Sequence, residues 1–229
     1  MYLVQIEIMP LIVQQIQTRF KVFQIFWLIE AVLAPILIVL SEYFSVMQQS
    51  QTKQIVEGAN PALTFNIIFV LIFFGVLFVS LIISITGTVF YAMLTHGIFN
   101  YLKQKKASKI DPTWAVWSIF IPIASNILTA LNANKGFELL ELNSSTAKNN
   151  LNYAIFKVII ISILAIGNII YAFYEIFNNI ENINQPFMNT TFYINILTTV
   201  ISVGLMYFTW KVMKEMKDVI VSENTEQLS

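Results

Sequence analysis

The chain has 229 residues, of which 57% are hydrophobic and only 11% charged, and its 13 basic and 13 acidic side chains cancel. Soluble domains carry about 25% charged residues, because a surface in water needs charge. The composition therefore predicts an integral membrane protein and excludes soluble enzyme folds, and the zero net charge does not point to a nucleic acid partner. There are no cysteines and one histidine, so neither disulfides nor a Cys- or His-based metal site is expected, and we expect no cofactor.

Four stretches are long and apolar enough to cross a bilayer as helices, which takes about 20 residues. We predict an all-α fold, an integral membrane bundle of four transmembrane helices that forms a single domain over residues 1–229, ending in a polar tail at 218–229. The predicted spans are residues 22–40, 66–94, 153–173 and 192–210.

A fifth apolar stretch, residues 114–131, is interrupted by polar residues and by Pro122. With four spans and a cytoplasmic N-terminus, every Lys and Arg outside the spans except Lys53 lies on the cytoplasmic side, as positive-inside topology requires. A fifth crossing would destroy this asymmetry. The stretch is therefore predicted to be a re-entrant or in-plane cytoplasmic element of two short helices bent near Pro122, since proline removes a backbone donor.

The first residues carry a different pattern. Val4, Ile6 and Ile8 alternate with polar residues, which predicts a short strand. Pro10 would then stand in the first turn of a helix that leads into the first span.

Glu30 lies about eight residues inside the first predicted span. A charge at the centre of a span costs about 2.5–3.5 kcal/mol, so this side chain is expected to face the bundle. Hydroxyl partners at compatible depth include Ser84, Thr88 and Ser202. An intramembrane carboxylate indicates proton or cation handling, and the alternative is a carboxyl group that only fixes helix register.

Small and polar residues recur every fourth position along the second span and into the segment after it, and similar faces occur in the third and fourth spans. Such faces are either packing seams or the walls of a polar pathway. His96 is interfacial or titrates near neutral pH, but no catalytic partner accompanies it and an enzyme is not expected. The candidate intramembrane polar site is Glu30, Ser84, Thr88, His96, Asn168 and Ser202.

A basic cluster just after the second span is followed by two tryptophans one helical turn apart. Anionic lipid attracts such lysines, and indole rings suit the headgroup region. These residues are candidate lipid-surface contacts, and the alternative is a general topology and anchoring signal. The set is Lys103, Lys105, Lys106, Lys109, Trp114 and Trp117.

Three short motifs resemble an uncharacterised family of bacterial four-helix membrane proteins. They are Ser84-Ile-Thr-Gly-Thr-Val-Phe90 followed by Asn100, the segment Pro112-Thr-Trp-Ala-Val-Trp-Ser-Ile-Phe-Ile-Pro-Ile-Ala-Ser-Asn126, and Glu138. The resemblance covers residues 66–210 and implies four spans, a bacterial origin and a Pro-x-Trp … Phe-x-x-Pro-x-x-Asn-like cytoplasmic element. The chain departs from the family at Leu128-Thr129-Ala130, and the family has no assigned activity.

The sequence thus predicts a multi-pass protein of the bacterial inner membrane with both termini in the cytoplasm. The expected role is a structural or interaction component, whose partners are the lipid bilayer and a membrane protein or second copy. The alternative is a small transporter or channel subunit that uses the intramembrane carboxylate.

Overall fold

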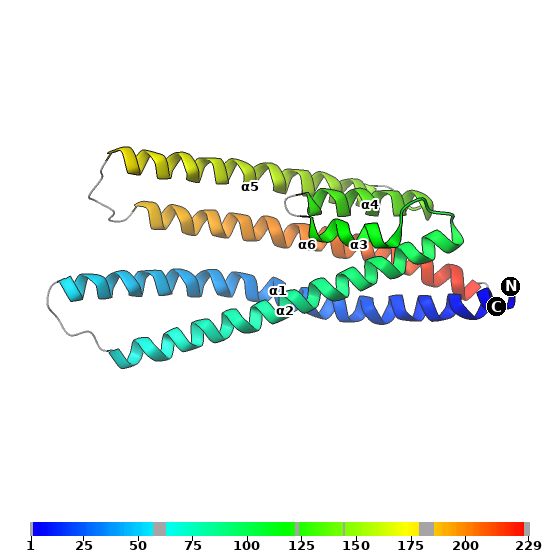
Figure 1. The fold of residues 1–229 in the computed structure, drawn as a ribbon, viewed down its shortest axis with the longest axis horizontal. Coiled ribbons are helices and arrows are strands. Elements are labelled where there is room, and N and C mark those ends of the chain that lie inside the picture. The colour runs from blue at the N-terminus through cyan, green and yellow to red at the C-terminus, as the bar shows by residue number, and fades with distance from the viewer. Residues whose placement is uncertain (1, 57–62, 122–123, 144, 179–185, 227–229) are drawn as a thin grey trace.

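The computed structural model describes residues 2–56, 63–121, 124–143, 145–178 and 186–226, and these fold into six α-helices without a strand. Four helices are long and two are short (Figure 1). Their bounds are α1 Tyr2–Val56, α2 Leu63–Lys105, α3 Pro112–Phe120, α4 Ser125–Leu139, α5 Ser145–Asn178 and α6 Pro186–Glu226.

The predicted all-α membrane fold is confirmed, since α1, α2, α5 and α6 are long and apolar enough to cross a membrane. Each contains one of the predicted spans. The shortest, α5, has 34 residues and is about 51 Å long at 1.5 Å per residue. The hydrocarbon core is about 30 Å thick, so the four helices continue well beyond it.

The stretch predicted to be re-entrant or in-plane forms a hairpin of α3 and α4, as two helical pieces. Pro122, where the bend was predicted, lies outside the described residues. The hairpin packs against α2 on one side and α5 on the other, and both helices run along the long axis of the bundle (Figure 1). The choice between a re-entrant and an in-plane position relative to the bilayer stays a prediction.

The hairpin begins at a capped helix start. The Asp111 side chain accepts a hydrogen bond from the Thr113 backbone N–H at 2.8 Å, and Pro112 occupies the first turn, where its missing N–H costs nothing. The Lys103 ammonium, 3.0 Å from the carboxylate, and the Thr113 N–H lower the pKa of Asp111 to about 2. Asp111 therefore stays charged, and holds the base of the hairpin to the end of α2, at all but strongly acidic pH.

The hydrophobic core lies in the proximal half of the molecule, defined here as the half that carries both described chain ends (Figure 1). Its residues come mainly from 12–23 of α1, 94–102 of α2, 212–220 of α6, and 133–140, which belong to α4 and its C-cap. Large apolar side chains in the spans are exposed instead, for example Phe78 at 64% and Val32 at 63%. A bilayer would cover these faces, so the proximal core is the part that packs like a soluble helical bundle.

The strand predicted around Val4–Ile8 is wrong, because α1 is already helical from Tyr2 and carries Pro10 in its interior. Alternation of apolar and polar residues over five positions is only a weak indication of a strand. Once a long helix has formed, each residue added at its end gains a backbone hydrogen bond without a second nucleation step. A lone strand would also leave its backbone groups unpaired.

Helix α4 ends in a Schellman motif. The Leu142 N–H donates to the Phe137 carbonyl at 3.0 Å and the Glu141 N–H to the Glu138 carbonyl at 3.2 Å, which is the 6→1 and 5→2 pattern. Glu141 takes φ 56° to make this turn, a conformation that is strained for a residue with a Cβ and free for glycine.

We expect Glu141→Gly to stabilise the protein by about 0.5–1 kcal/mol, because it removes the left-handed strain at an exposed position. The control is Lys135→Gly, an exposed position inside α4, which should destabilise by about 1 kcal/mol. Reversible SDS unfolding of the detergent-solubilised protein measures both changes. A destabilised Glu141→Gly would contradict the assigned helix end.

Candidate functional site: a polar cavity at the hairpin tip

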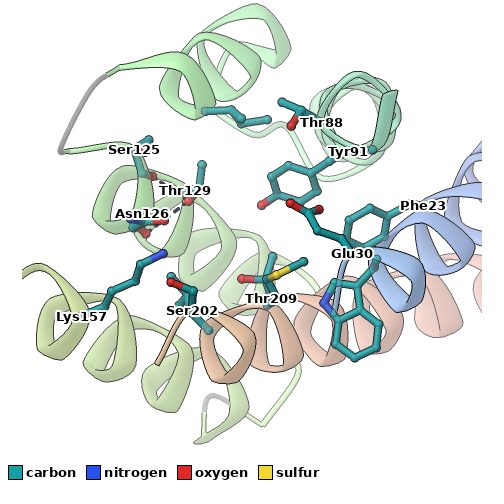
Figure 2. A pocket seen from close by; sticks show the side chains of 15 residues that line it. Phe23, Glu30, Thr88, Tyr91, Ser125, Asn126, Thr129, Lys157, Ser202 and Thr209 are labelled. Carbon is teal, nitrogen blue, oxygen red and sulfur yellow. Dashed lines mark hydrogen bonds between the residues drawn. The ribbon is translucent and has the colours of Figure 1, made fainter. Parts of the chain in front are cut away.

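A cavity of about 340 Å³ lies where the tip of the α3–α4 hairpin meets the long helices (Figure 2). All six helices contribute to its wall. The lining residues are Phe23, Trp27, Glu30, Gly87, Thr88, Tyr91, Ile119, Ser125, Asn126, Thr129, Lys157, Ser202, Leu205, Met206 and Thr209.

Relative to the predicted spans, the cavity lies at membrane depth and is displaced towards the proximal side. Lys157 is four residues, about 6 Å, inside the predicted span of α5, and Glu30 is eight residues, about 12 Å, inside that of α1. Half of a 30 Å hydrocarbon core is about 15 Å. The cavity therefore extends from near the proximal interface to just short of the bilayer centre.

Glu30 projects from α1 into this cavity (Figure 2). The Ser84 hydroxyl of α2 donates a hydrogen bond to Glu30 Oε1 at 3.1 Å. Among the described residues this is the one partner of the carboxyl group, which retains acceptor capacity. The Thr88 hydroxyl is engaged in its own helix, where it donates to the Ser84 carbonyl at 2.9 Å. Gly87, whose Cβ would lie 3.3 Å from the Phe26 Cβ, lets α1 approach α2 closely at this point.

Lys157 projects from α5 on the other side of the cavity, towards Asn126 of the hairpin tip (Figure 2). It forms neither a hydrogen bond nor an ion pair with any residue in the described part of the chain. An ammonium group within a membrane span is energetically unfavourable unless it is paired with an opposite charge or reaches water. The cavity thus holds one partly satisfied carboxylate and one unpartnered amine.

The hairpin tip supplies neutral polar groups. Thr129 donates its hydroxyl to the carbonyls of Ser125 and Asn126, at 2.7 and 3.2 Å. The Ser125 hydroxyl and the Asn126 amide form no hydrogen bond with the described residues and face the cavity. These donors and acceptors are available to a ligand.

The remaining wall is mostly aromatic and apolar, with two further hydroxyl groups at Ser202 and Thr209. The Trp27 ring stacks on Trp210 at 5.9 Å between centroids, and Phe23 lies 5.3 Å from Tyr91. The Trp27 Nε1 atom is buried and has no hydrogen-bond partner among the described residues. Such a wall with a few convergent polar groups is typical of small-molecule sites.

The structure brings together only part of the predicted polar site. Glu30, Thr88 and Ser202 line the cavity, and Ser84 binds Glu30. His96 is exposed and does not line it. Asn168 belongs to α5, but its side chain lies outside the described part of the structure.

Sequence reasoning missed the hairpin tip and Lys157 as site residues. Lys157 was the single charge in the third predicted span, which was itself a signal equal to that of Glu30. The polar residues Ser125, Asn126 and Thr129 counted as interruptions of the fifth apolar stretch and as positions in the family comparison, but none was predicted to be a site residue. These three residues line the cavity because the hairpin packs between the long helices, and the positions of the residues along the sequence do not reveal that packing.

The predicted lipid-contact residues lie at the proximal end. Lys103 forms an ion pair with Asp111 and Lys106 forms one with Glu223, each at 3.0 Å. Trp114 and Trp117 are 51% and 61% exposed on α3. Their contact with lipid headgroups stays a prediction.

No family model, curated protein or solved structure matches the chain. The resemblance to a bacterial four-helix family therefore stays an expectation. Within the described ranges no group of three His, Cys, Asp or Glu side chains is placed to bind a metal ion.

We predict that Glu30→Leu destabilises the protein by about 1 kcal/mol, because it leaves the Ser84 hydroxyl without its partner at membrane depth. Glu30→Gln keeps an acceptor oxygen and should unfold like the parent. The matched control is Glu42→Leu, further along α1 and outside the cavity, which should not destabilise. SDS unfolding measures all three, and a Glu30→Leu variant as stable as the parent would show that the hydrogen bond is not formed.

Proposed function

We propose that the protein is a small transport or channel component of the bacterial inner membrane, which binds a cation or the cationic group of a solute at Glu30. The observation that carries this proposal is that Glu30 lines a 340 Å³ cavity at membrane depth and is not enclosed by packing. A carboxylate that only fixed helix register would be closed off by its neighbours. No catalytic chemistry is assigned to the site.

The orientation in the membrane is part of the proposal. Both described chain ends and the base of the hairpin lie at the same end of the bundle (Figure 1). The basic residues outside the spans, apart from Lys53, belong to these proximal segments. The positive-inside rule then favours a cytoplasmic proximal half, so the cavity would open on the cytoplasmic leaflet.

A purely structural or interaction role is the second candidate. It is favoured by the hydrogen bond from Ser84 to Glu30, which satisfies part of the carboxyl group, and by a proximal core that draws on all six helices. A membrane-protein partner or a second copy would then occupy the exposed apolar faces of the spans. The two candidates differ in whether Glu30 is needed for flux.

Proteoliposome flux assays separate them, with H⁺, K⁺ and Na⁺ as probes. We expect flux above that of empty liposomes, a loss of at least tenfold in Glu30→Gln, and retention in Glu42→Gln, which removes a carboxylate of α1 outside the cavity. Glu30→Gln keeps an acceptor for the Ser84 hydroxyl, so a loss of flux in this variant would result from the missing charge and not from misfolding. Absence of flux in the parent for all three cations would refute cation transport and favour the structural role.

A further inference from the structure

The strongest unexplained feature of the cavity is that it contains charges of both signs that do not pair. Glu30 and Lys157 line the same cavity from α1 and α5, yet no ion pair joins them. Glu30 is held by Ser84 on α2, whereas Lys157 points towards Asn126 on the hairpin (Figure 2). The two charges therefore remain separate and both face open volume.

A ligand with charges of both signs fits this arrangement. A cation bound at Glu30 would leave the Lys157 ammonium without a counter-charge, and an anion bound at Lys157 would leave Glu30 without one. A zwitterion satisfies both groups and enters without changing the net charge of the site, which limits the desolvation cost at this depth. The amide of Asn126 and the hydroxyl of Ser125 add hydrogen bonds on the Lys157 side.

We propose that the cavity binds a zwitterionic phosphoethanolamine group, with its phosphate at Lys157 and the hairpin tip and its ammonium at Glu30. This inference rests on the proposed function, in that it takes the cavity as the binding site. A primary ammonium matches Glu30, because its N–H groups can donate to the oxygen that Ser84 leaves free. A phosphate matches Lys157, Ser125 and Asn126, which offer N–H and O–H donors.

Position favours a source within the bilayer. Lys157 is about 6 Å inside the span, close to where headgroups of the proximal leaflet lie. The α2 and α5 helices do not form a packed pair, and the hairpin fills the space between them only on the proximal side. A phosphatidylethanolamine headgroup and free phosphoethanolamine share the same chemistry, so the experiment must distinguish the two.

Native mass spectrometry of the full chain, released from nanodiscs of equal phosphatidylethanolamine and phosphatidylglycerol content, tests the proposal. Both lipids carry a phosphate and only the first carries an ammonium. We expect at least tenfold preferential retention of phosphatidylethanolamine by the parent. Lys157→Met should lower retention of this lipid at least tenfold, and Glu30→Gln should remove the preference over phosphatidylglycerol. The control Lys148→Met, at an exposed position of α5 outside the cavity, should behave like the parent.

A second arm adds free phosphoethanolamine to delipidated protein and follows retention of the free compound. Retention that depends on Lys157 and Glu30, with no retained lipid, would support the zwitterion and assign it to a solute. Equal retention of both lipids and none of the free compound, or no effect of Lys157→Met, would overturn the inference. Cation flux without a bound headgroup contradicts only the zwitterion, whereas a bound headgroup without flux contradicts only transport.

Discussion

The cost of placing charge in hydrocarbon is the constraint on which the rest of this structure depends. Glu30 and Lys157 stand in segments that are long and apolar enough to cross the bilayer, and an ionised group exposed to lipid there costs several kcal/mol. Both side chains accordingly turn inward. Because they come from helices on different sides of the bundle and do not pair, the space between them has to stay polar and open, and the cavity is the result.

The proximal core supplies stability that offsets the packing lost at this cavity. Residues of α1, α2, α4 and α6 pack into one continuous cluster that lies outside the predicted spans except for Phe23 and Leu94 at their proximal ends. Arg19 adds a hydrogen bond to the Met93 carbonyl at 3.0 Å. The hydrophobic effect acts fully on this aqueous part and little between helices in lipid. The helices are therefore held together at one end, and the hairpin tip can line a cavity without itself sealing the bundle.

The spans, the hairpin and the inward direction of Glu30 were predictable, because each follows from hydrophobicity, proline or the position of a charge along the chain. The strand near Val4 was wrong because alternation over five residues says nothing about the long helix beside it. The cavity was not predictable from the sequence. It arises where Lys157 and the tip residues Asn126 and Thr129 converge, and their convergence depends on the depth to which the hairpin enters.

The central claim is that water reaches a cavity between the spans, and cysteine accessibility tests it most directly, since the natural chain contains no cysteine. Ser202 lines the cavity and Val200, two residues earlier on α6, is 61% exposed on its outer face. In membrane vesicles, Ser202→Cys should react with a water-soluble methanethiosulfonate reagent at least tenfold faster than Val200→Cys, which would face lipid. Equal rates, or faster reaction at Val200→Cys, would show that the cavity is closed to water and contradict the account.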